Sequence, residues 1–226
     1  NGPLPHNIHE EPDNSPPITD PAEIKSYRSN LGAYSYYAST SRPDLSYSAT
    51  FFSRYMQQPT EQADRLLHAA IIRYAKATSN VSILIRKPPT KDLRLVTHVD
   101  ASFGSCHNVY PQTGFVVMHQ DNILCWSSHK QKRVARSTTR AELLALEEAT
   151  DYLCYLKPFL NLFFDKVTLE IGTDSNDVVH LLKSVHAKPA EKALVHKIRE
   201  LHGKLMVVPL WALAQSLESE RILCYH

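Results

Sequence analysis

The stretch ILCWSSHKQKRVARSTTRAELLALEEA, residues 123–149, passes from an apolar strand-like segment through a cationic loop into a helix. At 100° per residue, four apolar side chains share a helix face with Glu142: Ala145, Leu146, Ala149 and Leu153. Three charged side chains fall on the far side: Arg140, Glu147 and Asp151. Because burying an unpaired charge is costly, a carboxylate on the apolar face predicts a special role for Glu142.

The bulk composition allows one large domain or two small ones. The chain has 226 residues, of which 43% are hydrophobic, and this is enough to bury real cores. Its formal net charge is only +2. Overall charge therefore gives no argument for a nucleic-acid partner, and any cationic surface must be local.

Cysteine usage and hydropathy indicate an intracellular protein, cytoplasmic or nuclear. The four cysteines are widely spaced and form no CxxC pair, which is typical of a reducing compartment. No apolar run reaches the ~18 residues that span a bilayer, and the basic-then-apolar order of a signal peptide is absent. We expect no membrane partner.

The first part of the chain reads as a leader followed by helices. Residues 1–22 are rich in proline and poor in large apolar side chains, which predicts a flexible leader. Residues 23–86 carry three helical patterns with Asp, Pro or Thr start signals. Six tyrosines in this segment could stack on bases, but their helical spacing favours a core: Tyr27, Tyr34, Tyr36, Tyr37, Tyr47 and Tyr55.

The part from residue 94 to residue 226 reads as an α/β domain. Strands are expected in LRLVTHVDAS (93–102), in TGFVVMHQDNILCWSS (113–128, two strands turning at 120–122), in KVTLEIGTDS (166–175) and in KLMVVPLW (204–211). Helices are expected over 137–163, 175–185 and 189–203. This order predicts a mixed sheet flanked by helices.

Three carboxylates are expected to meet at one edge of this sheet. Asp100 and Asp174 lie at the ends of two apolar strands, where sites are usually built, and Glu142 lies one turn into the long helix. Converging carboxylates repel one another unless a cation compensates them. Oxygen ligands suit Mg²⁺ or Mn²⁺, and two such ions about 4 Å apart can activate a water for phosphodiester cleavage.

Each acidic residue also has a purely structural interpretation. Thr139 and Glu142 have the spacing of a capping box, in which the carboxylate would bond a backbone N–H at the helix start. Asp174 could cap the helix that follows it. The order and placement of the three residues together favour the metal site.

Four motifs follow one another along the α/β part of the chain: HVDAS (98–102), CWSSHKQ (125–131), STTRAEL (137–143) and GTDSN (172–176). In this order they resemble the ribonuclease H domain of copia-type long-terminal-repeat retrotransposon Pol polyproteins. Residues 27–78 resemble the helical segment that follows the polymerase palm in the same polyproteins, so the likeness covers about residues 23–210. It implies a ribonuclease H-like mixed five-stranded sheet preceded by a thumb- or connection-like helical segment.

The resemblance also implies a site and a substrate. Asp100, Glu142 and Asp174 would be metal ligands of a two-metal nuclease that cuts the RNA strand of RNA–DNA hybrids, as part of a larger Pol polyprotein. Their Asp-Glu-Asp order differs from the Asp-Asp-Glu order of integrases with the same fold. The family's fourth aspartate has no match here, and Glu218 is the nearest candidate. A catalytically silent nucleic-acid-binding or interaction module is therefore the alternative.

The cationic loop before the long helix is the candidate substrate-binding segment. It carries five basic side chains and one hydroxyl: Lys130, Lys132, Arg133, Arg136, Arg140 and Ser137. Neutralising phosphates there would give salt-dependent, sequence-independent affinity. A charge run is often only a solvated face, but this one lies beside the proposed metal site.

Overall fold

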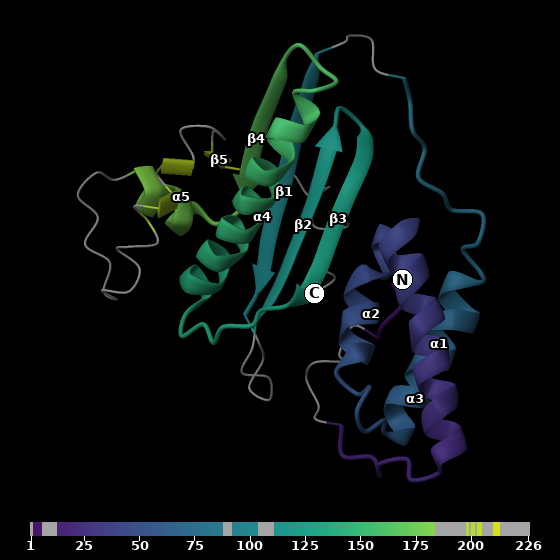
Figure 1. Cartoon of the computed structure of the whole chain (residues 1–226). Helices are drawn as coiled ribbons and strands as arrows, with labels where there is room; N and C mark the ends of the chain where they lie inside the picture. Colours follow the sequence, from purple (N-terminus) through teal and green to yellow (C-terminus); the bar gives the residue numbers. More distant parts are fainter. Residues whose placement is uncertain are drawn as a thin grey trace.

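The computed structural model describes residues 2–5, 13–87, 92–103, 111–183, 198, 200, 201, 203, 204 and 210–212. A helical unit comes first along the chain, and an α/β unit with a single sheet follows it (Figure 1). Each unit has its own hydrophobic core.

The helical unit consists of α1 (Pro21–Thr40), the short turn η1 (Pro43–Leu45), α2 (Ser46–Ser53), α3 (Glu61–Ala69) and the π-helical turn η2 (Ala70–Ala75). Local signals fix two of the helix starts. The Asp20 side chain accepts from the Ala22 N–H before α1, and the Thr60 hydroxyl accepts from the Ala63 N–H before α3. These are the start signals expected from the sequence.

The tyrosines of α1 divide between core and surface. Tyr27 and Tyr34 are buried, and the Tyr27 hydroxyl donates to the Phe52 carbonyl oxygen at 2.8 Å. This confirms the core interpretation for those two. The core interpretation is wrong for Tyr36 and Tyr37, which are 66% and 59% exposed. These two side chains do not lie on the face of α1 that packs against α2 and α3, where the buried residues recur every three or four positions.

The second half of the expected flexible leader is packed. Ile18 is 9% exposed, and its N–H donates to the Pro59 carbonyl oxygen at 2.8 Å. Asp13 accepts hydrogen bonds from Ser15 and Thr60. One buried apolar side chain and a few hydrogen bonds thus hold part of this proline-rich stretch against the start of α3.

The α/β unit is built on one mixed sheet. Its elements are β1 (Leu93–Ser102), β2 (Gln112–His119), β3 (Asn122–Lys130), α4 (Thr138–Leu160), β4 (Val167–Thr173), α5 (Asn176–Lys183) and β5 (Leu210–Ala212). The strand order is β3-β2-β1-β4-β5. Strands β1 to β3 are antiparallel, whereas β4 runs parallel to β1 and β5. Within the described residues, this confirms the predicted mixed α/β sheet of five strands.

The C-terminal elements differ in detail from the prediction. Ile198, Glu200, Leu201, Gly203 and Lys204 are helical. Lys204 thus belongs to a helix rather than to the last strand, which the structure places at 210–212. The rest of the predicted helix over 189–203, and residues 205–209 of the predicted strand, lie outside the described residues.

Helix α4 packs across the sheet and forms the centre of its core (Figure 1). The four apolar side chains predicted to share a face with Glu142 are all fully buried: Ala145, Leu146, Ala149 and Leu153. Glu147 was expected on the far side, but it is only 8% exposed, and it lies at the wall of a cavity between α4 and the β2–β3 part of the sheet. In the part of the chain that the structure describes, no helix is both long and apolar enough to cross a membrane.

The helical unit contacts the edge strand of the sheet, with α2 beside β3 (Figure 1). The Thr50 hydroxyl donates to the Ser128 carbonyl oxygen at 2.6 Å, and the Trp126 indole N–H donates to the Ala38 carbonyl oxygen at 2.7 Å. Exposed edge strands invite pairing with other chains, and this contact covers part of β3. The two units are therefore joined by specific bonds as well as by the chain.

Candidate metal centre

Strand register brings the two aspartates to the same edge of the sheet. In the parallel pair of β1 and β4, Val99 lies opposite Thr173. Asp100 and Asp174 each follow directly after these residues. The carboxyl ends of neighbouring parallel strands share one edge, so the two side chains emerge together there. Helix α4 begins at this edge, and it carries Glu142 in its second turn.

The three carboxylates come close enough to share an ion. One carboxylate oxygen each from Asp100, Glu142 and Asp174 lies within 4.8 Å of the other two. Asp174 is exposed and Asp100 half-buried, whereas Glu142 is only 6% exposed. The predicted convergence is thus present in the structure.

Glu142 is the member of the cluster that most needs a cation. Its carboxylate accepts a hydrogen bond from the Ala101 N–H, but its Oε2 is buried and has no hydrogen-bond partner. Burial, with the nearby carboxylates of Asp100 and Asp174, raises the pKa of Glu142 to about 9, and the Ala101 hydrogen bond opposes the rise. Without a cation the side chain therefore keeps a proton at neutral pH.

The donor set fits a hard divalent cation. All three groups offer oxygen, which Mg²⁺ and Mn²⁺ prefer. One group is buried and unsatisfied, and the exposed Asp174 leaves the cluster open to solvent and substrate. Asp100, Glu142 and Asp174 are the described residues that could hold the metal.

The structural alternatives for the acidic residues are wrong. The N-cap of α4 is Ser137, whose hydroxyl accepts from the Arg140 N–H at 3.2 Å, so Thr139 lies inside the helix and heads no capping box. Before α5 the cap position is Ser175, whose carbonyl and hydroxyl oxygens accept from the N–H groups of Val179 and Val178. Neither Glu142 nor Asp174 is therefore needed to begin a helix.

The basic side chains lie in two places. Lys130, Lys132 and Arg133 line a cavity of about 850 Å³ between α4 and the β2–β3 part of the sheet. Arg136 lies before α4 and Arg140 lies in its first turn, and neither residue lines this cavity. Glu218 lies outside the described residues, so its predicted place in the cluster stays a prediction.

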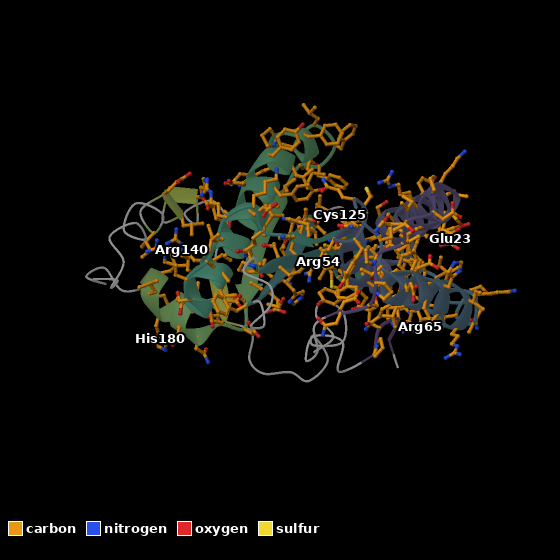
Figure 2. The ribbon with its side chains drawn as sticks, turned by 90° about the horizontal axis from the view of Figure 1, so that it is seen from below. Glu23, Arg54, Arg65, Cys125, Arg140 and His180 are labelled. Atoms are coloured by element: carbon orange, nitrogen blue, oxygen red, sulfur yellow. The ribbon has the colours of Figure 1, made fainter. Side chains whose placement is uncertain are left out.

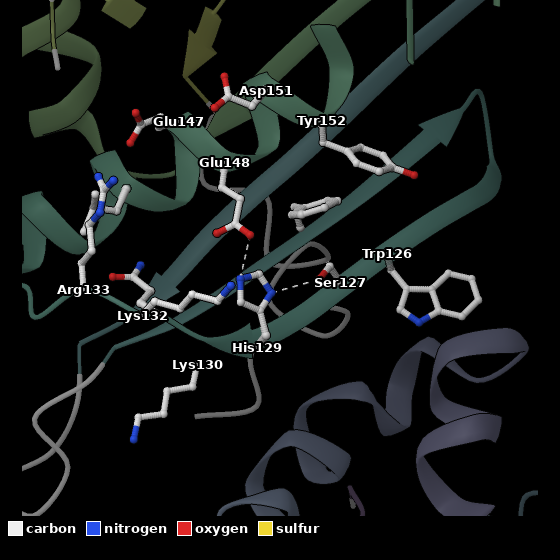
Figure 3. Close-up of a pocket in the computed structure, with 13 residues that line it drawn as sticks. Trp126, Ser127, His129, Lys130, Lys132, Arg133, Glu147, Glu148, Asp151 and Tyr152 are labelled. Atoms are coloured by element: carbon white, nitrogen blue, oxygen red, sulfur yellow. Dashed lines mark hydrogen bonds and ion pairs between the residues drawn. The ribbon is translucent and has the colours of Figure 1, made fainter. Parts of the chain in front are cut away.

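The cavity beside the loop carries charges of both signs (Figure 3). The acidic wall comes from α4, and Glu148 Oε1 lies 2.9 Å from His129 Nε2. His129 Nδ1 lies 3.0 Å from the Ser127 hydroxyl. None of the three clustered carboxylates lines this cavity, so the cationic loop faces partly away from them.

Gln131 was not among the predicted site residues, but it lies next to the centre. This side chain is 5% exposed, and it donates to the carbonyl oxygen of Ala141, the residue before Glu142. The available signal was its position at the end of the CWSSHKQ motif, directly before the loop. A polar residue between strand and loop is ordinarily solvated, and the sequence did not show that α4 would cover it.

Comparisons with known proteins agree with the motifs. No family model matches the chain. The chain is 39% identical over 126 residues to the retrovirus-related Pol polyprotein from transposon RE1 of Arabidopsis thaliana, a match covering 55% of this chain and 8% of that protein. It is 34% identical over 140 residues to the corresponding polyprotein from transposon RE2 of the same plant, covering 62% of this chain and 9% of that protein. The chain thus spans less than a tenth of the length of these relatives.

Two solved structures match parts of the chain. A foamy viral protease-reverse transcriptase in complex with double-stranded DNA matches with a TM-score of 0.53 at 11% identity, over 88% of this chain and 33% of that chain. A ribonuclease H1 isolated from compost matches with a TM-score of 0.45 at 18% identity, over 57% of this chain and 92% of that chain. At 11% identity the likeness to the foamy viral protein concerns the fold alone.

Proposed function

We propose that this chain, a relative of the retrovirus-related Pol polyproteins of transposons, is a ribonuclease H-like nuclease segment that hydrolyses the RNA strand of RNA–DNA hybrids. Its partners would be the hybrid and the remainder of a Pol polyprotein, and its place of action the cytoplasm or nucleus. Mg²⁺ or Mn²⁺, as two ions, would be the cofactor.

The observation that carries the proposal is the buried, unsatisfied Oε2 of Glu142 beside two further carboxylates. A structural carboxylate would be expected to accept hydrogen bonds on both oxygens, because leaving a buried acceptor unpaired costs about 1–3 kcal/mol. A cation shared with Asp100 and Asp174 would satisfy it. The same cation would allow Glu142 to lose its proton and ionise beside the other two carboxylates.

Each residue of the cluster would contribute differently. Glu142, held inside the protein, would fix the position of the metal, whereas the exposed Asp174 and half-buried Asp100 would face the substrate. Bound divalent ions would supply the charge that activates a water and stabilises the leaving oxygen of the phosphodiester. Lys130, together with the other basic residues of the loop, would bind the phosphate backbone without reading sequence.

A cleavage assay tests the proposal. A labelled RNA–DNA hybrid is incubated with the protein and Mg²⁺ or Mn²⁺, with the matched DNA duplex as a substrate control and Asp100→Asn as a protein control. Cleavage of only the RNA strand, lost in the variant, supports the nuclease. No cleavage above the variant, together with salt-sensitive hybrid binding that Glu142→Gln leaves unchanged, would instead support a silent nucleic-acid-binding module.

A further inference from the structure

Gln131 connects the sheet to the first turns of α4. Its side-chain amide nitrogen donates to the Ala141 carbonyl oxygen at 2.9 Å and to the Thr113 hydroxyl at 3.0 Å. Its backbone N–H donates to the Pro111 carbonyl oxygen at 2.7 Å, which fixes the residue beside the start of β2. The side chain thus bonds simultaneously to a strand and to a helix.

These bonds close a ring around Glu142. Thr113 on β2 lies opposite Ala101 on β1 in the sheet register, and the Ala101 N–H donates to the Glu142 carboxylate. Gln131 bonds to Thr113 on one side and to Ala141, the residue before Glu142, on the other. The ring therefore sets the distance between the start of α4 and the strand that carries Asp100.

The same side chain is poorly satisfied as a structural group. Its carbonyl oxygen, Oε1, is buried and has no hydrogen-bond partner. The amide cannot simply be turned over, because the Ala141 carbonyl oxygen accepts and needs the amide nitrogen opposite it. A buried acceptor without a partner opposes folding and so offsets the two bonds that the nitrogen makes. Gln131 thus contributes little to stability, although its bonds help to set the position of the start of α4 relative to β1.

We propose that Gln131 is a positioning residue for the metal centre, holding the first turns of α4 so that the Glu142 carboxylate meets Asp100 and Asp174. The inference rests on the proposed function, because it assigns Gln131 a role only through a metal bound at these carboxylates. The hydrogen bonds of the Gln131 side chain go to Thr113 and Ala141 rather than to the three carboxylates. Its effect is carried by the Ala141 backbone.

The test compares Gln131→Met with Thr150→Val. Methionine keeps the approximate length of the side chain and removes both the NH₂ donor and the carbonyl acceptor of the amide. Thr150 is a matched control, because its buried hydroxyl donates to the Leu146 carbonyl oxygen at 2.7 Å in the same helix, two turns beyond Glu142. For each protein we would measure the Mn²⁺ dissociation constant by calorimetry, the melting temperature without metal, and the Mn²⁺ dependence of hybrid cleavage.

We expect Gln131→Met to raise the Mn²⁺ dissociation constant about 10-fold, since groups that orient metal ligands are worth about 10–100-fold in affinity. Its melting temperature without metal should stay within a few degrees of wild type, because two lost bonds are offset by the removal of an unsatisfied acceptor. Thr150→Val should lower the melting temperature and leave Mn²⁺ binding unchanged. Substrate affinity, measured as KM at saturating Mn²⁺, should not change in either variant.

Two results would overturn the inference in distinguishable ways. If wild type binds Mn²⁺ and cleaves hybrid while Gln131→Met does so with equal metal affinity, Gln131 does not position the centre and the proposed function stands. If wild type binds no more Mn²⁺ than Asp100→Asn, the metal centre itself is refuted and the role of Gln131 falls with it. If Gln131→Met fails to fold, Gln131→Leu repeats the measurement with a smaller apolar side chain.

Discussion

The carboxyl of Glu142 makes the metal-free protein less stable as the pH rises. In the folded chain its pKa is about 9, against an ordinary value of 4.5. Between these two values the folded state keeps a proton that the unfolded state has released, so the free energy of unfolding falls with increasing pH. This loss of stability is absent below the ordinary pKa of 4.5 and complete above pH 9. Glu142→Gln cannot titrate and should escape it.

The size of this effect follows from the displacement of the pKa. One pKa unit corresponds to about 1.4 kcal/mol, so at about pH 8 the substitution should stabilise the metal-free protein by up to about 5 kcal/mol. For a chain of this length that raises the melting temperature by about 10 °C. At about pH 5 the two proteins should melt within a few degrees of each other. Glutamine can still accept the Ala101 hydrogen bond, so the comparison isolates the charge.

Thermal melts in EDTA at both pH values measure this difference. Glu148→Gln is the matched control, because it removes an exposed carboxylate from the same helix and breaks only its ion pair with His129, worth about 0–1 kcal/mol. Mn²⁺ at a hundredfold its dissociation constant should then stabilise wild type by about 2.7 kcal/mol and Glu142→Gln much less. Equal stability of wild type and Glu142→Gln in EDTA at the higher pH would refute the reasoning.

The structure makes three further predictions. Ser137→Ala removes the N-cap of α4 and should cost about 1 kcal/mol in the free energy of unfolding, measured by urea denaturation; an unchanged KM would assign Ser137 to capping rather than to substrate binding. Replacing Lys132 and Arg133 with alanine should weaken hybrid binding and reduce the slope of log affinity against log salt by about 1–2, measured by fluorescence anisotropy, and an unchanged slope would show a solvated face. Trp126→Phe removes the indole N–H that donates to Ala38 and should cost about 1 kcal/mol, seen as faster proteolysis between the two units; equal protection would show that this bond does not hold them together.

The sequence was sufficient for features with a short, repeating signal. The alternation of apolar residues placed the strands, and the 3.6-residue period placed Glu142 on the same face as Leu146. The ends of two apolar strands identified Asp100 and Asp174, whose meeting follows from parallel register. These inferences needed only local pattern and general rules of sheets.

Features that depend on distant packing could not be inferred in the same way. Thr139 and Ser137 are both capping residues by type, and their position relative to the preceding loop, which makes Ser137 the N-cap, is not visible in the sequence. Tyr36 is the same residue type as the buried Tyr34, but it lies outside the face of α1 that is packed against the other helices. The bond from Trp126 to a carbonyl 88 residues earlier in the chain has no local signature.

Gln131 illustrates the same limit within the site. Its type and place between strand and loop predict a solvated side chain, and its burial arises because α4 returns over the end of β3 and covers it. The arrangement of the basic residues of the loop also could not be inferred from the sequence. They read as one patch along the chain, but the fold divides them between a cavity wall and the start of α4 (Figure 2, where Arg140 is labelled).

The most direct test of the central claim is an anomalous difference map from a crystal of the protein grown with Mn²⁺. We expect a peak bound by carboxylate oxygens of Asp100, Glu142 and Asp174, with the Oε2 of Glu142 among the ligands. A map at saturating Mn²⁺ with no peak among these three side chains, or with the Glu142 carboxylate turned away from both aspartates, would contradict it.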